Sequence, residues 1–178
     1  GKAVGAQARR VLAAARGITE IAQSFHDPMA GELQLGLIPT VAPYLLSLIM
    51  PPIKKAFPGL KLWLHEQQTA VLLDRLRNAE LDFVIIALPV AATEDFAGID
   101  LFREPFWMAL PREDSLAKRG EASLSDLNNR EVMLLEEGHC LREHALDVCF
   151  TAGASEQGAF HATSLETLRH MVGEGMGI

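Results

Sequence analysis

Leu33-Gln-Leu-Gly-Leu-Ile38 is the first of several short apolar segments whose spacing decides the fold class of this chain. Strands are expected over residues 33–38, 60–65 and 82–87, and helices over residues 43–56 and 69–78. The last strand segment, Asp82-Phe-Val-Ile-Ile-Ala87, is a continuous apolar run of the kind that forms buried parallel strands. Regular alternation of strands and helices predicts a doubly wound α/β sheet.

The second half of the chain repeats this alternation after a connection over residues 89–100. Strands are expected over residues 106–110, 132–135 and 160–162, with a short helix after Ser123, a helix from about Cys140 and a helix opened by the capping box Thr163-Ser-Leu-Glu166. Residues 173–178 end that helix and resemble the beginning of another strand, so we expect a fragment that lacks its C-terminal part. Two α/β subdomains are predicted, over residues 29–100 and 101–178, both incomplete.

An amphipathic helix is predicted at the N-terminus. Residues 2 to about 25 carry apolar side chains at intervals of three and four, with arginines on the other faces. The turn-forming segment His26-Asp-Pro-Met-Ala-Gly31 follows it, so a linker helix and hinge are expected over residues 1–28. The apolar stripe of this helix needs a covering surface. A partner subunit would supply one, and folding back onto the chain's own domain is the alternative.

Composition bounds the class of protein. The chain has 178 residues, of which 49% are hydrophobic, enough to bury a core in one domain or two small ones. No apolar run is long enough to span a membrane, and the N-terminus has no signal-peptide pattern. With only two cysteines, the expected compartment is the cytoplasm. A formal net charge of −7 argues against nucleic-acid binding by this chain on its own.

The two cysteines, Cys140 and Cys149, are nine residues apart in one predicted helix. Nine helical steps place them on opposite faces and about 13 Å apart along the axis, whereas a disulfide needs Cα atoms within about 7 Å. Either the thiols never meet, or they meet after the helix unwinds, which would make the segment a redox switch. Two unrelated structural cysteines are the alternative, because buried free cysteines are common.

Cys140 is the better candidate for a reactive thiol. It lies at the expected helix start, where the helix dipole favours a thiolate, and His139 and Arg142 are close in sequence. The negative charges of Glu136 and Glu137, which precede Cys140 in the sequence, disfavour its thiolate. Cys149 is expected to be a buried thiol, among Leu146, Val148 and Phe150. A zinc site built from His139, Cys140, His144 and Cys149 is disfavoured, since one ion cannot reach both thiols on an intact helix.

Three turns carry polar chemistry where predicted strands end. They are Ile38-Pro-Thr40, Glu66-Gln-Gln-Thr69 and Gly138-His-Cys140. Ligands of open α/β sheets bind beyond the carboxyl ends of the strands, near helix N-termini. All three turns could therefore face one cleft between the subdomains. Either threonine could instead be a helix cap.

Four sequence strings, in order, resemble the LysR-type transcriptional regulators and in particular their peroxide-sensing members. They are Gly36-Leu-Ile-Pro-Thr40, Leu64-His-Glu-Gln-Gln-Thr69, Gly138-His-Cys-Leu-Arg142 and Ala162-Thr-Ser-Leu-Glu-Thr-Leu-Arg169. The resemblance covers essentially the whole chain and includes the spacing of the second cysteine. It implies a linker helix followed by two Rossmann-like α/β subdomains similar to periplasmic binding proteins. It also implies a cytoplasmic homotetramer whose DNA-binding winged helix-turn-helix precedes Gly1.

The resemblance assigns roles to individual residues. It makes Cys140 the peroxidatic cysteine and Cys149 the resolving one, with Thr40, Thr69 and His139 in the peroxide pocket. The implied partners are hydrogen peroxide, DNA, RNA polymerase and a thiol reductant such as glutaredoxin, with no membrane, cofactor or metal. Oxidation would rearrange the dimer of regulatory domains and activate antioxidant genes.

Two other classes of function are kept as alternatives. One is a LysR-type domain that binds a small metabolite in its interdomain cleft, with incidental cysteines. The other is a thiol peroxidase, for which the sequence offers neither a Cys-x-x-Cys motif nor a thioredoxin-like pattern. We therefore expect a regulatory protein and not an enzyme.

Overall fold

The computed structural model describes residues 1, 4–5, 7–8, 11–12, 14–15, 17–18, 29–158 and 160–178. Much of the predicted linker helix and hinge lies outside these residues, although the described positions between 4 and 18 have helical backbone. The chain divides into two compact units, residues 1–93 and 94–178. The predicted division into 1–28, 29–100 and 101–178 stays a prediction. No helix in the described part of the chain is long and apolar enough to cross a membrane.

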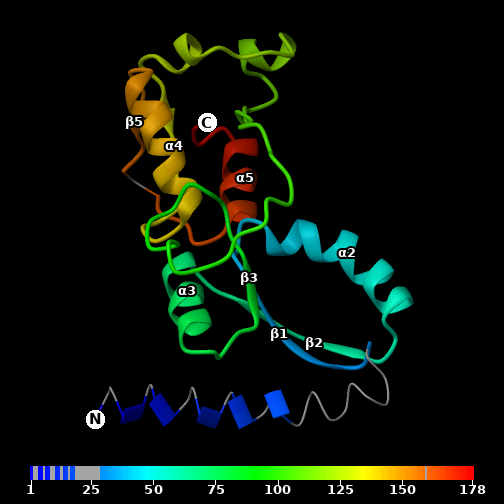
Figure 1. The fold of residues 1–178 in the computed structure, drawn as a ribbon. Coiled ribbons are helices and arrows are strands. Elements are labelled where there is room, and N and C mark those ends of the chain that lie inside the picture. Colours follow the sequence, from blue (N-terminus) through cyan, green and yellow to red (C-terminus); the bar gives the residue numbers. More distant parts are fainter. Residues whose placement is uncertain are drawn as a thin grey trace. The chain divides into compact units, whose positions relative to one another are not determined.

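The first unit contains a parallel three-stranded sheet with strand order β2-β1-β3 (Figure 1). Its elements are β1 (Gly31–Leu37), α2 (Ala42–Ala56), β2 (Leu60–Glu66), α3 (Thr69–Arg77) and β3 (Phe83–Ile85). Each predicted strand and helix is present, within a few residues of its expected bounds. The parallel pairing confirms the predicted α/β class.

Helices α2 and α3 pack on opposite faces of this sheet. Leu35 and Leu37 of β1 form a buried cluster with Ala42 of α2. Gly36 lies between these two leucines and faces the other way, and a Cβ built there would be 2.6 Å from Leu72 Cδ2 of α3. Because side chains alternate along a strand, the two helices cover different faces. Gly36 therefore allows α3 to pack closely.

Two details of this unit differ from the prediction. The apolar pattern of residues 69–78 predicts that Val71 faces inward with Leu72 and Leu73. Val71 is instead 42% exposed, whereas Leu72 and Leu73 are buried. The run over residues 82–87 forms a strand of only three residues, in which Phe83 is 44% exposed. The reason is position, since β3 pairs with β1 alone and forms an edge of the described sheet.

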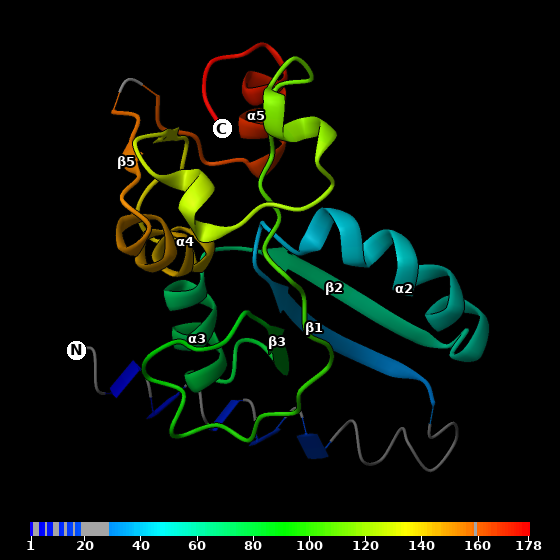
Figure 2. The same ribbon diagram turned by 90° about the horizontal axis from the view of Figure 1, so that it is seen from above.

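The second unit follows the same plan with shorter strands. Its elements are the 3₁₀ turns η1 (Ser115–Lys118) and η2 (Leu124–Leu127), β4 (Glu131–Val132), α4 (Cys140–Thr151), β5 (Ser155–Glu156) and α5 (Leu165–Gly173). Strands β4 and β5 are parallel. After α4 the chain turns at Gly153 and enters β5 (Figure 2).

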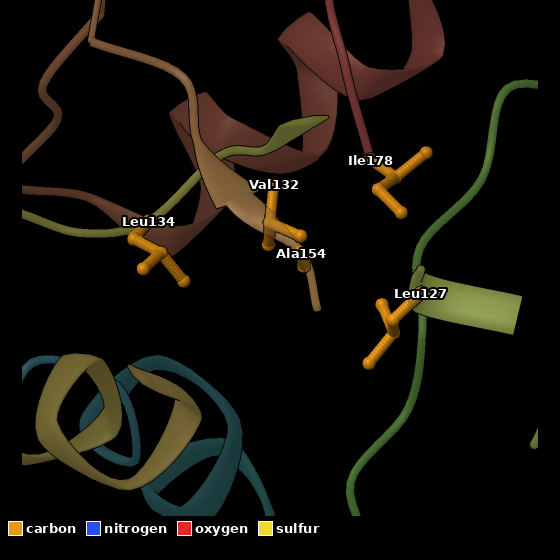
Figure 3. Packing of buried hydrophobic residues seen from close by; sticks show 5 residues of the cluster. All are labelled: Leu127, Val132, Leu134, Ala154 and Ile178. Carbon is orange, nitrogen blue, oxygen red and sulfur yellow. The ribbon is translucent and has the colours of Figure 1, made fainter. Parts of the chain in front are cut away.

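Residues 132–135 run through the core of this unit and pack on both sides. Val132 and Leu134 cluster with Leu127, Ala154 and Ile178, and α4 packs against this cluster (Figure 3). The intervening Met133 and Leu135 cluster with buried residues of α5. Because side chains alternate along the chain, one set of this segment meets the body of α4, and the other set meets α5 together with Leu141 at the start of α4.

Several predictions for the second unit are wrong. Residues 106–110 form no strand, because no strand in the described ranges pairs with them, although Met108 and Leu110 pack on the core. Residues 160–162 contribute a single bridge, between Ala162 and Leu135. Ser164, not Thr163, is the N-cap of α5, and its side chain makes no capping bond. Glu166, expected to complete the capping box, pairs with Arg169 at 2.7 Å.

The backbone of Ile178 pairs with residues 131 and 133, although no strand is assigned after α5. Its N–H donates to the carbonyl of Glu131, and its carbonyl accepts from the N–H of Met133 at 2.8 Å. The last described residue therefore lies beside β4, as the next strand of a sheet would.

Candidate functional site

Both cysteines lie in α4, as predicted, and both are free thiols. Gly138, with φ of 92°, makes the turn that precedes the helix. His139 has an extended backbone and forms the N-cap, and Cys140 is the first helical residue. Cys140 and His139 are 7% and 5% exposed. The thiol of Cys140 thus lies at the positive end of the helix dipole.

The relative burial of the two cysteines differs from the prediction. Cys140 is buried, whereas Cys149 is half-buried and packs against the cluster around Val132 and Leu134. Phe150, expected to shelter Cys149, is 58% exposed. Burial nevertheless raises the pKa of the Cys149 thiol. Cys149 is therefore held in its protonated form, while Cys140 has the environment of the helix start.

Arg142, predicted to support a thiolate at Cys140, has another partner. Its Nη1 and Nη2 donate to Oε1 and Oε2 of Glu156 at 2.6 and 2.9 Å, and Nη1 also donates to the carbonyl of Leu135 at 2.9 Å. The hydrogen bonds with Glu156 raise the pKa of Arg142 and lower the pKa of Glu156. Since Glu156 offsets much of its charge, Arg142 lies in the first turn of α4 as part of an ion pair. Its role in supporting the thiolate stays a prediction.

Glu156 is a residue that the sequence pattern did not reveal. It lies in β5, a strand of two residues that no apolar run announces. Beside it is an open hollow of about 440 Å³, lined by Glu136, Glu137, Arg142 and His161. The charge of His161 also lowers the pKa of Glu156. A polar, solvent-accessible region therefore adjoins the start of α4.

Thr40 and Thr69 follow adjacent parallel strands, β1 and β2, at the carboxyl edge of the sheet in the first unit. Neither is a helix cap, because Val41 is the N-cap of α2 and Gln68 is the N-cap of α3. The alternative in which either threonine caps its helix is therefore wrong. Thr69 is 5% exposed, and its Oγ1 has no hydrogen-bond partner among the described residues.

The loop that leads to Thr69 is fixed by its own contacts. The N–H of Gln67 donates to the carbonyl of Leu37 at 3.1 Å, and Arg75 Nη1 donates to Gln67 Oε1 at 2.7 Å. In the same sheet His65 and Gln34 share a hydrogen bond of 2.7 Å. The Thr69 hydroxyl, buried and without a partner among the described residues at the start of α3, is a donor available to a small polar ligand.

The structure thus places the predicted residues in two groups. Thr40 and Thr69 share one edge of the first unit, and His139, Cys140 and Arg142 share the start of α4 in the second. A cleft that combines the two groups stays a prediction. Over the described ranges, no three or more His, Cys, Asp or Glu side chains are arranged to hold a metal ion.

Comparison with known proteins identifies the family of the chain. Residues 26–178 match the family of the LysR substrate binding domain. A hydrogen peroxide-inducible genes activator from Dickeya chrysanthemi is 46% identical over 172 residues, which are 97% of this chain and 56% of that protein. The chain therefore spans a little over half the length of this relative.

Two solved structures show the same fold in two redox states. The oxidised form of OxyR is 48% identical, with a TM-score of 0.74 over 84% of this chain and 70% of that one. The reduced form of OxyR is 44% identical, with a TM-score of 0.75 over 84% of this chain and 69% of that one. On the match over residues 26–178 and these likenesses, the chain belongs to the family of LysR substrate binding domains.

Proposed function

We propose that this chain is the redox-sensing regulatory domain of a LysR-type transcription factor of the OxyR kind, which responds to hydrogen peroxide. The observation that carries the proposal is that a buried cysteine begins α4 and a second cysteine follows nine residues later in the same helix. The name of the 46% identical relative, an activator of peroxide-inducible genes, supports it.

In the first step the Cys140 thiolate attacks one oxygen of hydrogen peroxide. The S–O bond forms as the O–O bond breaks, so the sulfur is oxidised to a sulfenic acid and the peroxide is reduced, with hydroxide leaving. Charge develops on the departing oxygen, and hydrogen-bond donors directed at it lower the barrier. Thr40, Thr69 and His139 are the proposed donors, and Thr69 Oγ1 has no competing partner among the described residues.

In the second step the Cys149 thiol condenses with the sulfenic acid. The S–S bond forms, the S–O bond breaks, and the thiol proton leaves with the hydroxyl as water. The raised pKa of Cys149 keeps this thiol protonated and unreactive toward peroxide until the sulfenic acid has formed. Because the two residues start about 13 Å apart along the helix axis, the start of α4 must unwind before the bond can form.

The longer protein then acts through other parts. We infer that it binds DNA through an N-terminal winged helix-turn-helix, works in the cytoplasm as a homotetramer and contacts RNA polymerase. Unwinding of α4 changes the contact between regulatory domains, and a thiol reductant such as glutaredoxin restores the dithiol.

Trapping the intermediate tests the proposal. With limiting peroxide, a Cys149→Ser variant is expected to accumulate sulfenic acid on Cys140, detected as a dimedone adduct by mass spectrometry. The unchanged chain should give the Cys140–Cys149 disulfide, and Cys140→Ser should give neither product. If Cys140→Ser reacts with peroxide as fast as the unchanged chain, Cys140 is not the sensor.

A further inference from the structure

The first turn of α4 is joined to β5 by one strong polar contact, in addition to the packing of Leu141 against the cluster of Met133 and Leu135. Arg142, in the first turn, makes the two-pronged ion pair with Glu156 and also binds the carbonyl of Leu135. The side chains of Arg142 and Glu156 are only 11% and 23% exposed. A two-pronged pair with this burial is stronger and more directional than an exposed one.

Glu156 is itself held firmly. It pairs with Val132 in the parallel β4–β5 ladder, and the N–H of the next residue, Gln157, donates to the carbonyl of Val132 at 3.0 Å. The Arg142–Glu156 ion pair therefore joins the first turn of α4, which must unwind for the disulfide to form, to a residue that is held in the β4–β5 ladder. In the sequence, most of α4 and Cys149 lie between Arg142 and Glu156.

We propose that Glu156 is a positioning residue that clamps the first turn of α4 in the dithiol state and so resists formation of the disulfide. This inference rests on the proposed peroxide-sensing function. Arg142 is two residues from Cys140, so Cys140 cannot travel to Cys149 while the clamp is intact. The clamp slows the second step, condensation to the disulfide, and does not change the rate of the first step, the attack of Cys140 on peroxide.

The test compares Glu156→Gln with the unchanged chain for each step separately. Sulfenic acid formation is measured in a Cys149→Ser background by rapid mixing with hydrogen peroxide, followed by dimedone trapping at successive times. Condensation is measured with both cysteines present, from the appearance of the disulfide. We expect Glu156→Gln to speed condensation about tenfold. We also expect the dithiol–disulfide potential, measured in glutathione buffers, to fall by about 30 mV, which corresponds to a tenfold change in the equilibrium constant.

Asp114→Asn is the matched control. Asp114 pairs with Arg130 in the same unit at a similar burial, but neither residue belongs to α4. This variant should lower the stability of the unit without changing either the condensation rate or the potential. Glu156→Asp, which keeps the charge but is too short to span both guanidinium nitrogens, should shift both quantities in the direction of Glu156→Gln by a smaller factor.

Two results would overturn the clamp. One is an unchanged condensation rate and potential in both Glu156 variants. The other is a change confined to sulfenic acid formation, which would mean that Glu156 acts only on the charge near the Cys140 thiolate. If the parent Cys149→Ser chain forms no sulfenic acid, the proposed function fails instead, and the two failures are distinguishable.

Discussion

Replacing Thr69 with valine separates a ligand-binding role from a structural one, because the two roles predict opposite changes in stability. The Thr69 hydroxyl is buried and has no hydrogen-bond partner in the described part of the chain. Valine has nearly the same shape and lacks the hydroxyl. Thr69→Val should therefore stabilise the first unit and slow the oxidation of Cys140.

The magnitudes follow from the burial. A buried polar group without a partner costs about 1–3 kcal/mol, and threonine and valine have similar helix propensities. We expect the free energy of unfolding to rise by about 1 kcal/mol. If the Thr69 hydroxyl donates to the departing oxygen, removing it should slow Cys140 oxidation by one to two orders of magnitude. Each factor of ten corresponds to about 1.4 kcal/mol of activation free energy.

The two tryptophans allow each unit to be followed separately. Trp63 lies in β2 of the first unit, and its Nε1 donates to Glu32 at 2.8 Å. Trp107 belongs to the second unit and is 84% exposed, so Trp107→Phe should be well tolerated. In that background, fluorescence during urea denaturation reports the unfolding of the first unit, and dimedone trapping reports the rate.

Thr167→Val is the control, since Thr167 is exposed on α5. Thr167→Val should change neither the free energy of unfolding nor the rate of Cys140 oxidation appreciably. A Thr69→Val variant that loses stability and keeps its oxidation rate would refute the reasoning, because the hydroxyl would then be making a structural contact and no functional one.

Two further outcomes are expected. Gly36→Ala should destabilise the first unit by about 1–3 kcal/mol, because its Cβ would lie 2.6 Å from Cδ2 of the fully buried Leu72; urea denaturation of this variant should be compared with Gly98→Ala, where the new Cβ meets nothing within 4 Å, and equal stabilities would contradict the close packing. The pKa of Cys149 is raised from an ordinary value of 9.0 by burial, so the stability that the protonated thiol contributes should be present below that value and be lost as the pH rises through the folded pKa. In a Cys140→Ser chain, iodoacetamide should label Cys149 at a higher midpoint pH when the chain is folded than when it is unfolded in urea, and coincident midpoints would exclude the burial effect.

The sequence was sufficient for the alternating plan of the fold. In the first unit, apolar runs of strand length between amphipathic segments predicted all three strands and both helices. Residues 33–38 place leucines at every second position, which is the period of a strand, so this segment is distinctive without knowledge of its neighbours. The shared helix of Cys140 and Cys149 was also predictable, from the turn at Gly138 and the absence of a helix breaker after it.

What the sequence did not reveal depends on pairing between distant residues. Residues 106–110 have strand composition, yet a strand requires a partner, and none in the described ranges pairs with them. Thr69 resembles a cap, but the extended backbone of Gln68 moves the helix start by one residue and leaves the threonine hydroxyl buried. Glu156 is one of many charged residues until the turn at Gly153 returns it to the first turn of α4.

Packing also explains why α4 is suited to unwinding. Cys140 is the one residue of α4 that is buried. The shorter α3 buries Leu72, Leu73 and Thr69, and the shorter α5 buries Leu168 and Val172. Local opening is easiest where few apolar contacts must be lost. In the first turn of α4, Leu141 packs against the cluster of Met133 and Leu135, and Arg142 adds the charged contact with Glu156. A charged group released into water recovers its solvation. A helix fastened in this way can open at Cys140 while the buried residues 132–135 stay in place, so a local change at one sulfur need not disrupt the core.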